Sequence, residues 1–134
     1  MNAEHTQTLF DEFSDLFRGR NKSLMESLMP FGFECEDGWF DIVYNLSKEL
    51  AEYAKKNNCD IEASQVKEKF GTLRFYVRSE CADKIYETIA KYEKLSASTC
   101  ELCGEPGILI KKTGWYMTRC EKHKDITQRE WTEI

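Results

Sequence analysis

The sequence has few residues that break regular structure and no long apolar run. Its 134 residues include two prolines and seven glycines, and no Ser/Gly-rich tract, which argues against long disordered segments. Apolar runs extend over only a few residues, far short of the ~20 that a membrane-spanning helix needs. The start, Met1 to His5, lacks the basic and apolar stretches of a secretory signal. We therefore expect a cytoplasmic protein of one domain, or of one domain with a small appended module.

The chain also lacks a surplus of basic residues. Its net charge is −5, and residues 1–96 account for all of it with 13 basic and 18 acidic residues, whereas residues 97–134 carry six of each. General nucleic-acid binding requires a strongly basic surface. The overall charge therefore argues against nucleic acid as a partner, and only a local basic patch could override it.

Histidine is scarce, but one of the two histidines stands at metal-ligand spacing. Cys100 and Cys103 are separated by two residues, Cys120 and His123 by two, and sixteen residues lie between the pairs. Two such half-sites around a finger-sized insert are typical of a structural Zn²⁺ site. Four protein ligands leave no position for a catalytic water, so the sequence predicts one structural zinc ion. A [4Fe–4S] cluster is the alternative.

The insert predicts a small zinc finger of treble-clef type. Two β-like runs, 107–110 and 115–118, follow the first half-site, and a helix is expected after the second. On that helix Thr127, Gln128 and Trp131 are expected to complete an interface or to pack on the core.

Hydrophobic periodicity predicts an α+β fold in which helices flank a β-hairpin, followed by the treble-clef-like zinc finger. Helices are expected at 6–18, 39–56 and 81–95, with a short helical turn at 23–29 that Pro30 ends and a loop at 32–39. Period-two alternation over 60–79 predicts the hairpin. We expect two units, an α+β domain over 1–96 and the zinc module over 97–134.

A hairpin loop at Gly71-Thr72 would sort the side chains of the two strands onto two faces. Phe70 would then oppose Leu73 and share the core side with Val66, Phe75 and Val77, where Glu68 is a misfit. The other side would carry the candidate partner-binding residues Lys67, Lys69, Arg74, Tyr76 and Arg78. This basic face could bind an acidic protein surface or phosphates. Alternatively, the acidic region around Trp39 or the first helix covers it within the chain.

Other residues are weaker candidates for a catalytic site. Asp37 and Asp41 could form a metal-dependent hydrolase site, although the simpler interpretation is that Asp37 caps the following helix. A nuclease built on the zinc finger would need a further histidine, and His5 is expected in a frayed terminus far from the finger. Cys35, Cys59 and Cys81 have no partner at metal spacing and are expected to be inert thiols.

Three blocks of the sequence resemble a known group of proteins. The blocks are Asp37-Gly-Trp-Phe-Asp41, Gln65-Val-Lys-Glu-Lys-Phe-Gly-Thr-Leu-Arg-Phe-Tyr76, and Thr99-Cys-Glu-Leu-Cys-Gly-Glu-Pro-Gly107 with the later Gly114-Trp115 and Cys120-x-x-His123. Over roughly residues 30–124 the chain is similar to small, largely uncharacterised proteins of bacteriophages and prophage-bearing bacteria. The resemblance implies a zinc-bound C-terminal part and a phage-related context, but no reaction.

These observations together favour a non-enzymatic binding protein. The expected partner is a host or phage protein, as for an inhibitor of a host defence system, in a bacterial or phage-infected cell. Nucleic-acid binding through the basic face and hydrolysis at Asp37/Asp41 are the alternatives.

Overall fold

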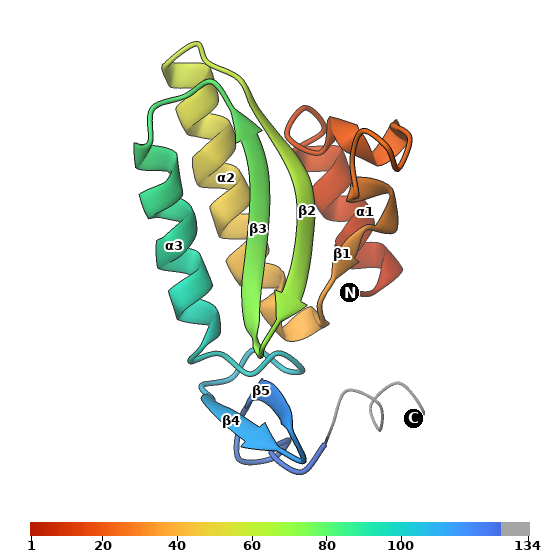
Figure 1. The fold of residues 1–134 in the computed structure, drawn as a ribbon, viewed down its shortest axis with the longest axis vertical. Helices are drawn as coiled ribbons and strands as arrows, with labels where there is room; N and C mark the ends of the chain where they lie inside the picture. The colour runs from red at the N-terminus through yellow and green to blue at the C-terminus, as the bar shows by residue number, and fades with distance from the viewer. Residues whose placement is uncertain (127–134) are drawn as a thin grey trace.

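The computed structural model describes residues 1–126 and has an α+β fold (Figure 1). Within these residues there are three α-helices, a three-stranded sheet and a two-stranded sheet. The helices are α1 (Ala3–Glu12), α2 (Phe40–Lys56) and α3 (Lys84–Ser96). The strands are β1 (Phe33–Glu34), β2 (Ile61–Lys69) and β3 (Thr72–Ser79) in the first sheet, and β4 (Ile108–Lys112) and β5 (Trp115–Arg119) in the second. No helix of the described part is long and apolar enough to cross a membrane.

The larger sheet covers α2 on one face and is open on the other. Its strand order is β1-β2-β3, with β1 parallel to β2 and β2 antiparallel to β3. Figure 1 shows β2 and β3 in front of α2, with α3 beside β3 and α1 on the side of β1. Leu46 and Leu50 of α2 are buried in one cluster with Val66 and Phe75 of the sheet. Burial on a single face explains the period-two pattern of the hairpin.

The predicted helices at 39–56 and 81–95 are confirmed, but the one at 6–18 is shorter than expected. Helix α1 ends at Glu12, and the chain then turns until the 3₁₀ helix η1 (Arg18–Asn21). The turn serves two contacts that a continued helix would not allow. The carbonyl of Leu16 accepts a hydrogen bond from the N–H of Ala63 in β2, and Phe17 packs edge-on against Phe33 of β1.

The expected loop at 32–39 contains regular structure instead. Residues 33–34 form β1, and Asp37–Trp39 form the 3₁₀ helix η3 just before α2. Nor does Pro30 end a helical turn, because it lies inside the 3₁₀ helix η2 (Met29–Phe31). Tertiary contacts decide these short elements, since a two-residue strand has no periodicity of its own to reveal it.

The hairpin turn lies one residue earlier than predicted, at Phe70-Gly71. Both residues have positive φ, 54° and 84°, and Lys69 pairs with Thr72 rather than Phe70 with Leu73. Phe70 is consequently 65% exposed and does not belong to the core. The misfit acid has a role in this turn, because the carboxylate of Glu68 accepts a hydrogen bond from the N–H of Gly71 at 2.6 Å.

The corrected register also accounts for a disulfide that the sequence analysis missed. Ile61 pairs with Ser79 beyond an irregularity between Ala63 and Gln65. Continued by two residues on each strand, this register places Cys59 opposite Cys81, and the two form a disulfide with a Cα–Cα distance of 5.3 Å. The expectation that these two cysteines are inert thiols is therefore wrong, whereas Cys35 is a buried free thiol.

The outer edge of β3 is protected by α3. The N–H of Leu73 donates to Ser96 Oγ and that of Phe75 to Glu93 Oε2, both at 2.9 Å. Unpaired N–H groups on an edge strand otherwise invite pairing with another chain. This part of the edge is therefore closed to strand addition.

Candidate metal centre and basic sheet face

The four predicted ligands converge at one point of the C-terminal module. The sulfurs of Cys100, Cys103 and Cys120 and a ring nitrogen of His123 all lie within 4.8 Å of one another. Among residues 1–126 this is the one group of three or more Cys, His, Asp or Glu side chains arranged to hold a metal ion. The predicted ligand set is thus brought together as a possible metal site.

The separations fit a single tetrahedral ion. Ligands at ~2.3 Å for sulfur and ~2.0–2.1 Å for nitrogen place two thiolates about 3.8 Å apart and a thiolate and an imidazole nitrogen about 3.5 Å apart. Cys103 Sγ and Cys120 Sγ are 3.6 Å apart, and His123 Nδ1 lies 3.7 Å from Cys100 Sγ and 3.2 Å from Cys120 Sγ. These three of the six separations are therefore close to those of a tetrahedral site.

Local backbone geometry brings the two half-sites to a common point. The N–H of Gly104 donates to the carbonyl of Cys100, and Gly104 has a φ of +82° that lets the chain reverse after the first pair. The N–H of His123 donates in the same way to the carbonyl of Cys120. The two-residue spacings thus become two tight turns whose side chains point to a common centre.

Glu101, between the first two ligands, joins the module to the larger domain. Its N–H donates to the carbonyl of Thr118 in β5, its carbonyl accepts from the N–H of Gly38, and its carboxylate accepts from the N–H of Glu36. Arg119 lies 3.6 Å from the same carboxylate, and both side chains are almost completely buried. Burial raises the pKa of Glu101 to about 7 despite the neighbouring guanidinium. Sequence reasoning missed this pair, and no motif marks it.

The η3 helix is fitted against the first half-site. A Cβ on Gly38 would lie 2.2 Å from the carbonyl oxygen of Cys100 and 2.4 Å from that of Glu101. Trp39 next to it is fully buried, and its indole N–H donates to the carbonyl of Thr99 at 2.9 Å. Only glycine permits this approach of the two backbones.

The tip of the β2–β3 hairpin makes a second junction with the module. Thr118 of β5 is buried and donates its hydroxyl to the carbonyl of Gly71 at 2.7 Å. A Cβ on Gly71 would lie 2.5 Å from Leu109 and 2.9 Å from the N–H nitrogen of Met117. The predicted units 1–96 and 97–134 therefore contact each other at η3 and at the hairpin turn, although their division into two units stays a prediction.

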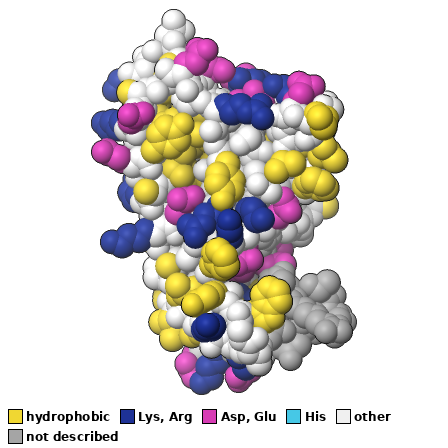
Figure 2. Space-filling view, viewed as in Figure 1, with side chains coloured by type: hydrophobic (Ala, Val, Ile, Leu, Met, Phe, Trp, Pro, Cys, Tyr) yellow, Lys and Arg dark blue, Asp and Glu magenta, His cyan; other side chains and the backbone are white. Residues whose placement is uncertain are grey.

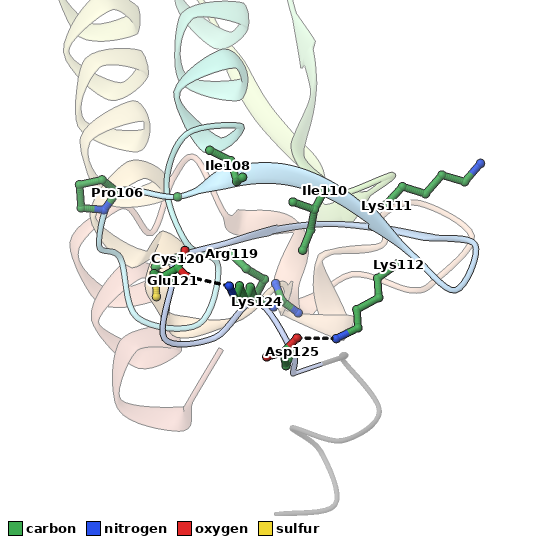
Figure 3. A pocket seen from close by; sticks show the side chains of 11 residues that line it. Pro106, Ile108, Ile110, Lys111, Lys112, Arg119, Cys120, Glu121, Lys124 and Asp125 are labelled. Atoms are coloured by element: carbon green, nitrogen blue, oxygen red, sulfur yellow. Dashed lines mark hydrogen bonds and ion pairs between the residues drawn. The ribbon is translucent and has the colours of Figure 1, made fainter.

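Next to the metal site lies a hollow of about 500 Å³ (Figure 3). Ile108 and Ile110 of β4 line it, together with Cys120 and the turn that follows. Two ion pairs cross its wall, Lys112 with Asp125 at 2.8 Å and Lys124 with Glu121 at 2.7 Å. The expected helix after Cys120 is not seen in the described part, where residues 121–125 form turns, and Thr127, Gln128 and Trp131 lie outside the described residues.

The five candidate partner-binding residues lie together on the open face of the larger sheet. Lys69, Tyr76 and Arg78 are exposed, and Lys67 and Arg74 are half-buried. No described helix covers them, and Figure 2 shows a band of Lys and Arg side chains across the middle of this face with acidic side chains at its flanks. The chain does not cover the face with α1 or with the region around Trp39.

Within the band, two cations face each other without an anionic partner. Lys67 and Arg74 are paired across β2 and β3, and neither they nor Lys69 has a carboxylate within 4.0 Å among the described residues. Glu34 of β1 neighbours Lys67 in the register, but its carboxylate accepts a hydrogen bond from Gln65.

The alternative pair of carboxylates has two different surroundings. Asp41 is exposed on the first turn of α2, whereas Asp37 accepts hydrogen bonds from the N–H of Asn2 and pairs with His5 Nδ1 at 2.9 Å. Burial would raise the pKa of Asp37, but these hydrogen bonds outweigh it and lower that pKa. Asp37 does not cap α2, and His5 is not frayed, because it lies in α1 and stacks on Phe40 at 3.9 Å.

No protein-family model, curated protein or solved structure matches this chain.

Proposed function

We propose that the chain is a non-enzymatic, zinc-stabilised binding protein that captures an anionic partner on its open sheet face. The opposed pair of Lys67 and Arg74 is the observation that carries the proposal. Like charges directly opposite each other on a sheet destabilise it. An anion bound between the two strands would turn this cost into binding free energy, because each cation would then gain a charge-assisted contact.

Zinc is the metal that the ligand set favours. Three thiolates and one imidazole in a tetrahedron suit Zn²⁺, and four protein ligands close the site to water. A first half-site turn, the β4–β5 hairpin and then Cys120 and His123 support a treble-clef-like finger in this proposal, with turns at residues 121–125 where a treble clef has a helix. In this proposal the ion is structural and stabilises the module that contacts the hairpin tip.

The absence of catalysis is part of the proposal and has two supports. A saturated metal site offers no position for an activated water. The second histidine, His5, is engaged by Asp37 and Phe40 at the start of α1. Hydrolysis at Asp37 and Asp41 would need a free Asp37 carboxylate. That carboxylate already binds Asn2 and His5 and so joins α1 to η3.

The biological setting is proposed from the sequence resemblance alone. We propose an accessory protein of a phage or prophage in the bacterial cytoplasm, which binds a host or phage protein and could inhibit a host defence system.

Charge reversal on the sheet face tests the binding function. The double variant K67E/R74E should weaken binding of a fluorescein-labelled polyglutamate peptide at least tenfold, measured by fluorescence anisotropy. Its melting temperature should stay close to that of the wild type, because the change replaces one pair of like charges on the open face by another. The matched control K55E/K56E alters two exposed lysines at the end of α2 and should bind as the wild type does. Undiminished binding by K67E/R74E would refute the proposal.

A further inference from the structure

An apolar groove opens on the open face at the end of the basic band. It has a volume of about 600 Å³, and Leu24, Met25 and Leu28 form one wall and Tyr76, Val77 and Arg78 the other. Met25 is 95% exposed and Leu24 53%. Figure 2 shows hydrophobic side chains gathered beside the basic band on this face. Apolar and cationic surfaces are thus continuous here.

The groove wall is fixed to the sheet, although it belongs to a loop. The N–H of Leu28 donates to the carbonyl of Ser64 at 2.9 Å, and Arg78 Nη2 donates to the carbonyl of Glu26 at 2.5 Å. Ser27 is buried and its hydroxyl accepts from the N–H of Met29 at 3.1 Å. A groove held at these points needs little ordering on binding, which favours affinity.

We infer that the groove and the basic band form one site for an acidic protein segment with an apolar anchor. This inference rests on the proposed function and names the partner's chemistry. The anchor would fill the groove beside Leu24 and Met25, and the carboxylates that follow it would reach Arg74, Lys67 and Lys69 in turn.

The charge pattern supports this order. Among residues 1–126, the cations of this face that have no carboxylate within 4.0 Å begin at Arg78 beside the groove and continue toward the hairpin tip. Arg78, Tyr76 and Arg74 alternate along one face of β3, with Lys67 paired to Arg74. Carboxylates of an extended chain bound along this line would meet one cation after another. Arg78 already uses one donor on Glu26, and a guanidinium has four more N–H groups for a ligand.

The apolar wall distinguishes a protein from a nucleic acid as the occupant. Single-stranded nucleic acids gain affinity by stacking bases on aromatic rings. This groove has one aromatic ring, Tyr76, and three aliphatic side chains, Leu24, Met25 and Leu28. Leucine and methionine adapt to the apolar residues of protein partners, and a single ring offers a base little stacking surface. Strand addition along the hairpin end of β3 is not the mode, since Ser96 and Glu93 accept the N–H groups of Leu73 and Phe75 there.

Two labelled peptides and an oligonucleotide test the inference on the full zinc-loaded chain. The first peptide carries two leucines followed by four glutamates, and its twin has serines in place of the leucines. The third probe is a single-stranded oligothymidylate with the same number of negative charges. Fluorescence anisotropy at two salt concentrations should show that the leucine peptide binds at least tenfold more tightly than either of the others.

Variants of the groove and of the band separate the two proposals. The double variant L24S/M25S should abolish the preference for the leucine peptide and leave the affinity for its serine twin unchanged, because both side chains are exposed. The variant K67E/R74E should bind both peptides more weakly than the wild type does. Equal affinities of the two peptides for the wild type, or tighter binding of the oligonucleotide, would overturn the inference and leave the basic face as a general anion site. Binding of both peptides unchanged in K67E/R74E would refute the proposed function itself.

Discussion

Removal of the metal ion should unfold the zinc module and leave the larger domain folded. The buried cluster of the module consists of Cys100, Leu102 and Cys120, with Ile126 packed against it, and Met117 of β5 is buried outside this cluster. Among the described residues of the module, Leu102 and Met117 are the buried apolar side chains that are not candidate ligands, and burying both contributes about 4 kcal/mol, whereas ordering the backbone costs about 1–2 kcal/mol per residue. A contribution on the order of 10 kcal/mol from zinc therefore decides whether the module folds.

The larger domain, in contrast, is stabilised by its apolar core and not by a metal ion. Nineteen buried residues form its cluster, from Leu9 to Ile89, and none of them is a metal ligand. The module adds hydrogen bonds at the two junctions, each with a net contribution of about 1 kcal/mol. Their loss should weaken the domain near η3 and the hairpin tip without unfolding it.

Amide hydrogen exchange before and after chelation measures both effects. Protection should disappear at Glu101, whose N–H donates to Thr118, and at Gly38, whose N–H donates to Glu101. The amides of α2 should remain protected. Elemental analysis should give one zinc per chain in the wild type and in the control C59S/C81S, but none in C100S/C103S. Protection of Glu101 that survives chelation, or loss of protection throughout α2, would refute this reasoning.

Two further predictions concern covalent and steric details. Denatured, metal-free chain purified under oxidising conditions should show four titratable thiols with Ellman's reagent and six after reduction. In urea unfolding, C59S/C81S should lower the free energy of unfolding by about 3 kcal/mol, because the disulfide that closes this loop restricts the unfolded chain. A count of six before reduction would contradict the disulfide. Gly38→Ala should cost about 1–3 kcal/mol and weaken zinc binding in a chelator competition, because its Cβ would meet the carbonyl oxygens of Cys100 and Glu101. Wild-type stability of this variant would show that the junction can relax.

The long elements were predictable from periodicity, and the short ones were not. Helix α2 and the strands of the hairpin each carry a repeated apolar pattern that only one secondary structure satisfies. The turn was misplaced by one residue because the pattern favours glycine at the first position of positive φ, whereas the chain puts Phe70 there. That error hid the disulfide, since only the true register brings Cys59 opposite Cys81.

The candidate sites were predictable to different degrees. The metal ligands follow from spacing alone, because two residues between ligands form the same tight turn in any chain that binds the ion. The basic face followed from strand alternation and survived the error in the turn, because the alternation itself was right. The groove was not predictable, since Leu24 and Met25 are far from Arg78 in sequence and meet it only through hydrogen bonds of a loop to the sheet edge.

The three sequence blocks that carry the resemblance meet at one place in the structure. The first contributes Gly38 and Trp39, the second contributes the turn at Gly71, and the third contributes the carbonyls of Thr99 and Glu101 that Trp39 and Gly38 bind. Their unusual residues are thus explained by a junction between the metal site and the sheet rather than by chemistry. That junction also orients the second sheet.

Phe70 at the hairpin tip lies edge-on to Tyr116 of β5, with ring centroids 6.5 Å apart, and Lys111 lies over the same tyrosine. Lys111 therefore continues the basic face beyond the tip, onto the module that carries the candidate metal site. A partner long enough to pass Lys69 would contact both sheets. Its affinity would then depend on metal loading, whereas a partner confined to the groove and to Arg74 would bind the metal-free chain equally well.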